Sequence, residues 1–471
     1  MSECLRRNFG RNRAWEAQCL RPASEDQVLE ILEQSAGKTI RAVGAGHSWS
    51  AIAVSEVSLE LSAFCAVALD EEPGGRLIVR AGAGCTLQAL LDCIRGCGRT
   101  LPTLGAIKKQ TVAGAVSTGT HGSGAPSLSQ FVVGARLAAY GADGRPRIVE
   151  IGRGDPALEA VRCGLGCTGI LLRVDLETVS RYDIEEEVLR FRSYRDAMRA
   201  MPEWPLTQFA LFPYAWTCLL FKRRRRPGAR SPCERLWAWL LRGYNTVWID
   251  TVFHLAVKLS AGLGDCAARF FQKHAQCVAA PYRRADDSEP VLTLHHYYFR
   301  HEEMELFVPA RHLRRALAVL RLATEMFAGN YVARVPSAAA LLRRAQLHDS
   351  LENLCGRYTH HYPYSIRRVP PESGLLAMGS AHPSDKGGDW YSISVFTYLP
   401  PHARSGYYAF CAWLARAMHR LFGARLHWGK HFPLGAAEVA AMYPQAQRFR
   451  ELCASYDPRG VFRNDFVRRL F

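Results

Sequence analysis

A histidine directly behind a pair of glycines is the first feature of this sequence that suggests chemistry. The segment RAVGAGHSWS, residues 41–50, places His47 next to Gly46 and three positions after Gly44. Glycine has no Cβ atom, so the main chain at these positions can approach a bound ligand closely. A neutral imidazole is a nucleophile near physiological pH. The segment therefore predicts a ligand-binding loop in which His47 either packs against the ligand or is bonded to it.

Two further glycine-rich stretches follow. Residues 101–126, LPTLGAIKKQTVAGAVSTGTHGSGAP, mix glycines with hydroxyl side chains, and residues 163–179, CGLGCTGILLRVDLETV, lead glycines into an apolar run. Main-chain N–H groups and hydroxyls together bind phosphate oxygens. Three such stretches favour one extended, phosphate-bearing ligand over flexible loops. The sequence has no G-x-G-x-x-G that opens a long helix and no Walker A motif, which argues against Rossmann and P-loop folds.

Helices and strands alternate around these loops. Residues 24–35 begin with a serine and carry apolar residues at helical spacing, and residues 86–98 form a threonine-capped helical pattern that ends in glycine. Residues 38–43, 57–61 and 77–81 are typical of strands. The pattern predicts an α+β fold with glycine-dense connections.

The chain is long and basic. It has 471 residues, 60 lysines and arginines against 43 aspartates and glutamates, a formal net charge of +17 and a pI near 9.4. The length suggests two or three domains. The charge suits nucleic acid, an anionic membrane surface or an acidic ligand, and it also fits a chain that is simply rich in arginine. No nucleic-acid-binding motif accompanies the charge, so no nucleic-acid partner is expected.

Fifteen cysteines are scattered along the chain. Two pairs have C-x-x-x-C spacing (Cys93 with Cys97, Cys163 with Cys167) without partnering histidines, so no metal site is expected. The cysteines are interpreted as small buried hydrophobes in a reducing compartment. The N-terminal residues show no apolar run behind their charges, so no cleaved signal peptide is expected and the expected location is the cytoplasm.

Taken together, the three glycine-rich segments resemble the FAD domain of the vanillyl-alcohol oxidase superfamily. The nearest branch contains the aldonolactone oxidases (gulonolactone and D-arabinono-1,4-lactone oxidases) and alditol oxidase. Near the C-terminus, LHWGKHF (residues 426–432) resembles the family's HWxK segment, and residues 442–471 resemble its closing stretch. The resemblance covers residues 1–180 and 405–471 well and the middle of the chain poorly.

The resemblance implies an α+β protein with a split FAD-binding domain of the PCMH type. Residues 1–180 form this domain, residues 181–405 form an α+β cap over the flavin, and residues 406–471 return to the FAD site. In this family a histidine at the position of His47 carries FAD covalently through the flavin C8 methyl group; a noncovalent flavin packed on His47 is the alternative. The implied FAD contacts are Val43, Gly44, Ala45, Gly46, His47, Ser48, Thr111, Ser117, Gly119, Thr120, His121, Gly122, Ser123, Gly169 and Ile170.

The implied reaction is oxidation of a CH–OH group, with hydride transfer to flavin N5 and loss of the hydroxyl proton. Lys430 matches the family lysine and is the first candidate for stabilising developing charge. Arg367 matches the arginine of a Glu-x-Arg segment, although Ser365 stands at the glutamate position. Lys430 and Arg367 are the predicted catalytic residues, and the predicted substrate contacts are Ser365, Arg367, Thr397 and Lys430.

Two departures from the sugar-oxidising relatives bear on the substrate. Ser365 replaces a carboxylate, and Val395 stands where alditol oxidase has a histidine. Both departures argue against a polyol and favour a lactone like arabinono- or gulonolactone, or a substrate with a carboxylate; Glu305 or Glu372 could instead supply the missing group. Residues 304–309 resemble the lactone oxidases.

The expected electron acceptor is O2, which gives H2O2. Three alternatives remain open: a membrane-associated flavin dehydrogenase that passes electrons to a quinone or cytochrome, an oxidase of a non-sugar alcohol, and a flavin-fold protein that only binds its ligand. The intact segment around Lys430 argues against the last of these.

Residues 221–290 form a basic, amphipathic insertion in the predicted cap. A basic run, Arg223 to Arg226, precedes a stripe of apolar residues. Charged residues interrupt this apolar stripe, so an ordinary transmembrane helix is not expected. Residues 221–264 predict either peripheral contact with an anionic membrane or a helix packed on the cap or at a dimer contact. The stripe has helical spacing and consists of Trp237, Leu240, Leu241, Tyr244, Val247, Trp248, Thr251, Val252, Leu255 and Leu259.

Overall fold

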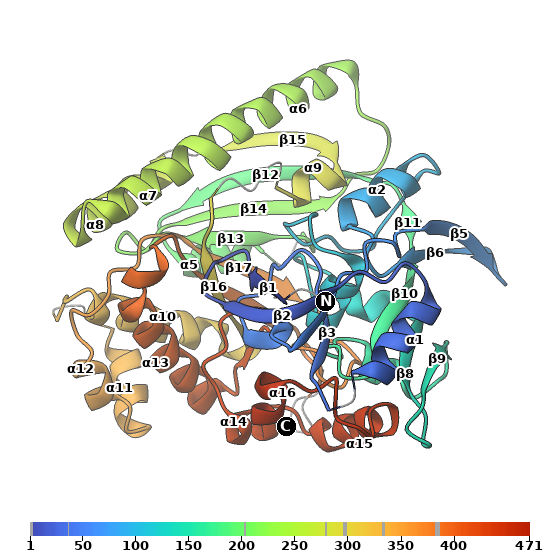
Figure 1. Ribbon diagram of the computed structural model, residues 1–471. Helices are drawn as coiled ribbons and strands as arrows, with labels where there is room; N and C mark the ends of the chain where they lie inside the picture. Colours follow the sequence, from blue (N-terminus) through green and yellow to red (C-terminus); the bar gives the residue numbers. More distant parts are fainter. Residues whose placement is uncertain are drawn as a thin grey trace. The chain divides into compact units, whose positions relative to one another are not determined.

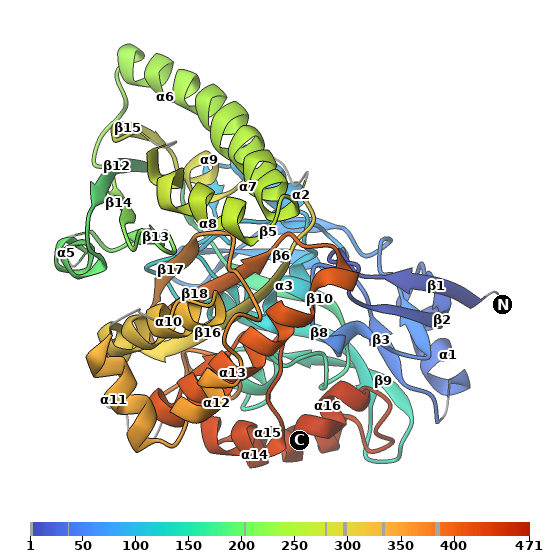
Figure 2. The same cartoon turned by 90° about the vertical axis from the view of Figure 1, so that its left-hand side faces the viewer.

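The chain folds into two compact units in a computed structural model (Figures 1 and 2). The structure describes residues 3–35, 37–201, 204–277, 280–294, 299–331, 335–381 and 387–471. The first unit contains Met1–Arg181, Pro371–Gly387 and His427–Phe471, and the second contains Tyr182–Pro370 and Gly388–Leu426. The first unit therefore draws on both ends of the chain.

These units differ from the expected domain boundaries in two places. Pro371–Gly387, expected in the cap, groups with the first unit. Helix α13 (Ser405–Phe422), expected in the returning C-terminal segment, groups with the second unit, so the return begins at His427. The functional assignment of the units as FAD domain and cap stays a prediction.

Two main sheets organise the first unit. One has the strand order β1-β2-β4-β3 and is parallel between β2 and β4 and between β3 and β4. The other is antiparallel, with the order β5-β6-β10-β8-β9. Their strands are β1 (Glu3–Arg7), β2 (Ala14–Leu20), β3 (Ile40–Ala42), β4 (Val57–Leu59), β5 (Val67–Glu72), β6 (Arg76–Gly82), β8 (Val132–Tyr140), β9 (Pro146–Ile151) and β10 (Ile170–Glu177), and β7 (Arg99–Thr100) pairs separately with β11 (Val179–Ser180).

The helices of this unit begin where the sequence predicted them. Helix α1 (Glu25–Gln34) is capped by Ser24, whose hydroxyl accepts a hydrogen bond from the Gln27 N–H at 3.3 Å. Thr86 caps α2 (Leu87–Arg95) in the same way. The expected α+β class is thereby confirmed. The other helices are α3 (Val112–Thr118), α4 (Leu158–Val161), α14 (Ala436–Met442), α15 (Ala446–Tyr456) and α16 (Asp465–Leu470).

One eight-stranded antiparallel sheet forms the centre of the second unit. Its order is β15-β12-β14-β13-β17-β18-β16-β19. Helices α10 (Leu313–Phe327) and α13 pack on β16 and cover one face with apolar side chains. The strands are β12 (Asp183–Phe191), β13 (Gln208–Leu211), β14 (Cys218–Arg225), β15 (Tyr282–Asp287), β16 (Glu302–Pro309), β17 (Tyr364–Val369), β18 (Trp390–Thr397) and β19 (Arg425–Leu426).

A nearly continuous helical stretch lies along β15 in this unit (Figure 1). It runs through α6 (Pro232–Tyr244), a π-helical segment (Asn245–Phe253) and α7 (His254–Gly262), and α8 (Asp265–His274) follows. Within the described ranges, no helix is both long and apolar enough to cross a membrane. The remaining helices are α5 (Tyr194–Ala200), α9 (Ser288–Leu292), α10 (Leu313–Phe327), α11 (Pro336–Arg344) and α12 (His348–Glu352).

The predicted basic run is largely neutralised within the sheet. Its arginines lie on β14 and directly after it, opposite acidic residues of β12 and α6. The pairs are Arg223 with the buried Glu186, Arg224 with Glu185 at 2.8 Å and Arg226 with Glu234 at 2.6 Å. The run therefore does not present four uncompensated charges to a membrane.

The interpretation of all cysteines as buried thiols was wrong. Cys4 and Cys19 form a disulfide that joins β1 and β2. Six of the free cysteines are exposed: Cys65, Cys93, Cys97, Cys233, Cys266 and Cys277.

Candidate cofactor and substrate sites

The glycine-rich loops form a cleft in the first unit. We name it the cofactor cleft; it contains about 1430 Å³ of empty space, part of it open to solvent. Main chain from three distant parts of the sequence, within residues 41–48, 110–118 and 165–171, lines it. The predicted contacts that line it are Val43, Gly44, Ala45, Gly46, His47, Ser48, Thr111, Ser117, Gly169 and Ile170.

The first two loops approach each other at Gly44. A Cβ atom at this position would clash with the Thr111 hydroxyl, so only glycine fits. Thr111 caps α3 by accepting a hydrogen bond from the Gly114 N–H at 3.3 Å. Gly46 adopts a left-handed φ of +70°, and its carbonyl accepts a hydrogen bond from the Phe9 N–H at 2.8 Å. The close main-chain approach that the sequence predicted is therefore present.

A buried arginine holds the wall of the cleft together. Arg41 is 6% exposed, and its guanidinium donates to the carbonyls of Ile52 at 2.9 Å, Gly166 at 3.2 Å, Phe462 at 2.6 Å and Leu165. No carboxylate of the described residues forms an ion pair with Arg41. A buried positive charge beside a cleft attracts anions. Together with the main chain and hydroxyls of the loops, Arg41 makes the cleft suitable for the diphosphate of FAD.

The C-terminal HWGK segment returns to this loop. The Trp49 N–H donates to the Gly429 carbonyl at 2.8 Å, and the Ser50 hydroxyl donates to the Trp428 carbonyl at 2.7 Å. Lys430 Nζ lies 4.4 Å from the centre of the Trp49 ring, an arrangement typical of a cation–π contact. The structure thus brings the predicted catalytic lysine to the loop that carries His47.

The environment of His47 keeps its imidazole neutral. The side chain is half-buried, and its ring centre lies 4.5 Å from that of Phe9. Burial, followed by the positive charges of Lys430 and Lys109, lowers the pKa of His47 to about 4. At physiological pH the ring is therefore in the form that acts as a nucleophile.

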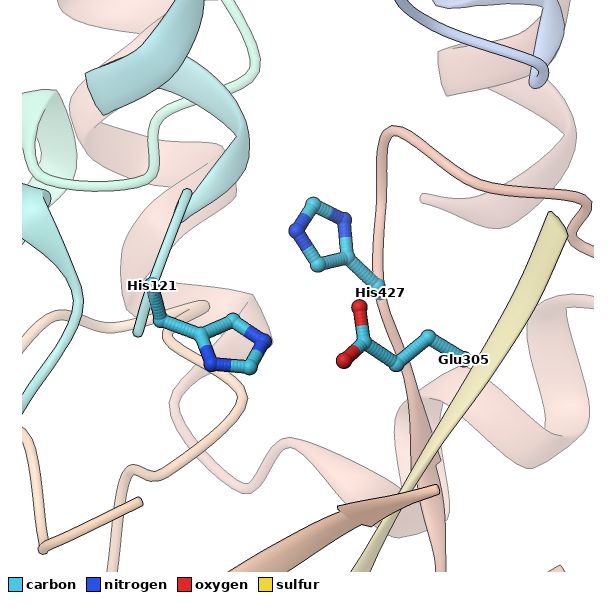
Figure 3. A group of neighbouring side chains, drawn as sticks. All are labelled: His121, Glu305 and His427. Carbon is cyan, nitrogen blue, oxygen red and sulfur yellow. The ribbon is translucent and has the colours of Figure 1, made fainter. Parts of the chain in front are cut away.

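The remaining predicted FAD contacts do not line the cofactor cleft. Gly119 ends α3 in a left-handed conformation, with φ +74°, and turns the chain away. The ring centre of His121 lies 5.9 Å from that of His427, and Figure 3 shows both side chains. This set consists of Gly119, Thr120, His121, Gly122 and Ser123.

The predicted substrate residues of the second unit lie on its sheet. Ser365 and Arg367 project to the same side of β17, as their spacing predicted. Ser365 pairs with Ser394 of β18 and Arg367 with Ser392. Arg367 forms no ion pair with any residue that the structure describes. Its neighbour on the opposite side of the strand, Arg368, pairs with Asp389 at 2.6 Å.

A carboxylate is present on this side of the sheet, although Ser365 replaces the expected one. Glu305 of β16 pairs with Ser394 and accepts a hydrogen bond from its hydroxyl at 3.2 Å. Glu305 is 2% exposed, and Figure 3 shows its side chain on β16. We name Ser365, Arg367, Ser392, Ser394 and Glu305 the polar sheet face.

Thr397 does not belong to this face. It lies an odd number of residues from Ser392 and Ser394 on β18, so it projects to the side covered by α13. There it pairs with Glu302, which forms an ion pair with Arg404 of the loop before α13 at 2.8 Å. Thr397 is thus separated from Ser365 and Arg367 by the sheet itself.

Val395 shares the side of Thr397. It is fully buried, and its carbonyl accepts a hydrogen bond from the Tyr407 hydroxyl of α13 at 3.0 Å. The side chain at position 395 is therefore not part of the polar sheet face. The other carboxylate considered, Glu372, belongs to the first unit and accepts hydrogen bonds from the N–H groups of Ser127 at 2.6 Å and Gly379 at 3.0 Å. The Glu372 carboxylate therefore holds the main chain at Ser127 and Gly379 in place.

Two family models match the chain. The model described as D-arabinono-1,4-lactone oxidase matches residues 190–470, and the model described as FAD binding domain matches residues 17–149. A long-chain alcohol oxidase from an uncultured marine euryarchaeote is 38% identical over 475 residues, which cover 99% of this chain and 96% of that protein. An L-gulono-1,4-lactone dehydrogenase from Mycobacterium tuberculosis is 25% identical over 471 residues, which cover 96% of this chain and 95% of that protein.

Solved structures of cholesterol oxidases share the fold. A solvent-stable cholesterol oxidase has a TM-score of 0.71 and 17% identity, covering 99% of this chain and 97% of that one. The cholesterol oxidase from B. sterolicum has a TM-score of 0.70 and 15% identity, covering 100% and 97%. These matches confirm the predicted α+β fold with a PCMH-type FAD-binding domain, and the FAD-binding family model confirms the predicted cofactor. The chain belongs to the D-arabinono-1,4-lactone oxidase family of FAD-linked oxidoreductases.

Proposed function

We propose that this FAD-dependent oxidoreductase oxidises the CH–OH group of a long-chain alcohol. The observation that carries the proposal is the 38% identity, along 99% of the chain, to a protein named long-chain alcohol oxidase. The serine at position 365 supports it, because a simple alcohol has no neighbouring hydroxyls that require a carboxylate there.

The proposal includes covalent attachment of FAD through His47. Bound FAD supplies the acceptor for the hydride that leaves the carbinol carbon. The neutral His47 ring lines the cofactor cleft and is the nucleophile that the attachment requires. Lys430, held over Trp49, carries the positive charge that stabilises negative charge as it develops during the reaction.

The substrate side of the proposal rests on the polar sheet face. Arg367 has a planar set of N–H donors that can bind a substrate oxygen. Ser394 and Glu305 are already joined by a hydrogen bond, so they present a fixed acceptor on this face. In this proposal Arg367 acts on a substrate oxygen, and Ser365 is a further substrate contact. Thr397 is not included, because it lies on the other side of the sheet.

A sugar lactone of the arabinono- or gulonolactone type is the second candidate substrate. The family model over residues 190–470 favours it, as does the 25% identical gulonolactone dehydrogenase. A lactone carbonyl suits Arg367, and the hydroxyls of a sugar suit Glu305. The polar sheet face can therefore serve this substrate as well.

The proposed electron acceptor is O2, with H2O2 as the product. A dehydrogenase that passes electrons to a quinone or cytochrome is the second possibility, because one relative is named a dehydrogenase. The proposal also includes peripheral contact between residues 221–264 and a membrane, since long-chain alcohols partition into lipid.

Anaerobic reduction of the bound flavin tests the substrate. Primary alcohols of increasing chain length are compared with D-arabinono-1,4-lactone, L-gulono-1,4-lactone and the matching aldonates. We expect flavin bleaching that becomes faster as the alcohol chain lengthens. Faster bleaching by either lactone than by every alcohol would assign the enzyme to the second candidate. The same reaction in air should release H2O2, and bleaching without peroxide release would identify a dehydrogenase.

A further inference from the structure

The exposed apolar side chains of this protein are concentrated in one short stretch. Among the described residues, fourteen large hydrophobic side chains are exposed, and eleven of them lie between positions 236 and 270. Nine of the eleven lie on α6, the π-helical segment and α7, the helical stretch that lies along β15 in the second unit (Figures 1 and 2); Leu263 directly follows α7, and Phe270 lies on α8. The eleven are Leu236, Trp237, Trp239, Leu240, Val247, Trp248, Val252, Leu255, Leu259, Leu263 and Phe270. We name this set the apolar helix face.

This stretch is apolar on two sides. Its inner side buries Ala238, Leu241, Phe253, Val257 and Ala268 against the second unit. A surface helix of a globular protein normally places polar residues opposite such a buried side. Here exposed positions of the stretch carry tryptophans and leucines instead, and exposed apolar side chains gathered in this way mark an interaction site.

Specific contacts hold the stretch to the sheet. Ser231 and Glu234 form a capping box at the start of α6, and Arg242 forms an ion pair with the buried Asp286. The indole N–H of Trp237 donates to the Arg283 carbonyl at 2.8 Å. The apolar helix face is therefore fixed in its exposed position by the second unit.

The charges beside this face identify its partner. The exposed ionisable side chains of α6 to α8 include Arg235, Lys258 and Lys273 on the basic side and Asp265 on the acidic side. Tryptophans with basic residues alongside leucines are typical of helices that lie in the interface of an anionic membrane. We propose that the apolar helix face binds the surface of an anionic phospholipid bilayer, with its leucines and tryptophans inserted at the headgroup boundary.

A second copy of the chain fits this face less well. A twofold dimer brings the same patch together from both subunits. Lys258 is exposed next to Leu259 of the apolar helix face, so such a dimer would bury its positive charge together with the apolar side chains. An anionic bilayer can bury the apolar side chains and attract the lysines to its headgroups at the same time. The inference deepens the proposed membrane contact by naming the lipid class, and it does not depend on which alcohol or lactone is oxidised.

Vesicle sedimentation of the full-length flavoprotein tests the proposal. Phosphatidylcholine vesicles are compared with vesicles that also contain phosphatidylglycerol. The first variant combines Trp239→Ser with Trp248→Ser, at positions 66% and 51% exposed, and the second combines Lys258→Gln with Lys273→Gln. The matched control combines Leu5→Ser with Tyr331→Ser, at positions 57% and 71% exposed that lie outside the apolar helix face.

We expect the unmodified protein and the control to sediment with anionic vesicles. The tryptophan variant should lower the partition coefficient at least about tenfold, because it removes two apolar anchors. The lysine variant should lower the preference for anionic vesicles by about thirtyfold, because each basic residue near the surface contributes about 1 kcal/mol, or about fivefold, and the variant removes two of them.

Two outcomes would overturn the proposal. One is an unmodified protein that does not sediment with anionic vesicles, or a tryptophan variant that sediments as well as the control. The other is a lipid-free dimer, seen by light scattering, that the tryptophan variant converts to a monomer; this result would assign the face to a second copy. Flavin bleaching by a water-soluble alcohol, measured without vesicles, tests the proposed reaction separately.

Discussion

The cofactor cleft and the polar sheet face recognise their ligands in different ways. Main chain and glycines dominate the cleft, and a Cβ atom at Gly44 would clash with the Thr111 side chain. The polar sheet face consists of side chains on alternate positions of three strands, for example Arg367 on β17 and Glu305 on β16. A single substitution can therefore change the chemistry of the sheet face, whereas the cleft is set by the path of the chain. We expect changes in the cleft to affect the cofactor and changes on the sheet face to affect the choice of substrate.

The largest effect is expected at His47. His47→Ala should abolish acid-stable flavin, because it removes the proposed point of attachment. Trypsin cleavage after Arg41 and Arg76 gives a peptide whose single histidine is His47, so mass spectrometry can show whether this peptide carries the flavin. The matched control is His431→Ala, since burial also lowers the pKa of His431 to about 4. Flavin on any other peptide of the unmodified protein would contradict the assignment.

Lys430→Met should slow the reaction without releasing the cofactor. The ammonium group lies over the Trp49 ring, and methionine keeps much of the side-chain volume at this position, so the fold should persist. Loss of one electrostatic donor typically costs about 10²–10³-fold in rate, and we expect a decrease of this size in single-turnover flavin reduction. The exposed Lys38→Met is the control. Unchanged reduction in Lys430→Met would remove this lysine from the mechanism.

Arg367 and Arg368 offer a matched pair on opposite sides of one strand. Arg367→Met should lower kcat/KM about 10- to 100-fold for a substrate with a carbonyl or carboxylate, because a hydrogen bond to a charged group contributes about 1.5–3 kcal/mol. The decrease should be smaller for a simple alcohol. Arg368→Met removes the ion pair with Asp389 and should act on stability instead. Equal effects of both variants on kcat/KM would mean that the polar sheet face does not contact the substrate.

The smallest expected effect is a dependence of the free energy of unfolding on pH. The folded pKa of His47 is about 4, below the value of about 6.5 expected for an unfolded chain. Between these two values only the unfolded state takes up the proton, so the free energy of unfolding should fall as the pH decreases through this range. In flavin-free protein, His47→Gln should lose less stability than the unmodified chain over this range. Identical pH profiles in denaturant titrations would contradict the lowered pKa.

Much of the cofactor cleft could be predicted from the sequence, because main-chain recognition leaves a local pattern. Gly44, Gly46 and the Thr111 cap lie in contiguous motifs, and these motifs pointed to the loops that line the cleft. The role of Arg41 could not be predicted, although it opens the quoted motif. Its carbonyl partners come from residues 52, 165, 166 and 462, and no local pattern indicates that these segments meet.

The polar sheet face could be predicted only in part, because it also depends on segments that are distant from one another in the sequence. Alternation along a strand correctly placed Ser365 and Arg367 on one side. Strand order is set by packing between distant segments, so the sequence could not show that β16 and β17 both neighbour β18. Glu305 was therefore one of two candidates for the carboxylate, and the sequence could not show that Thr397 projects to the opposite side of the sheet from Ser365 and Arg367. Residues 221–264 were predicted to be amphipathic, but which side faces outward depends on β15.

The joining of both chain ends in the first unit has a consequence for synthesis of the protein. Ser50 and its partner Trp428 are 378 residues apart, and the Asn464 side chain donates to the carbonyls of Ala51 at 2.9 Å and Val54 at 2.8 Å. At about 5–20 residues per second, a ribosome needs roughly 20–75 s to make the intervening chain. During that time the loop around His47 lacks the partners that fix it. Residues 182–370 of the second unit leave the ribosome before those partners are made. Flavin loading is therefore expected to follow chain release, and a chain that stalls before its last helix would remain colourless.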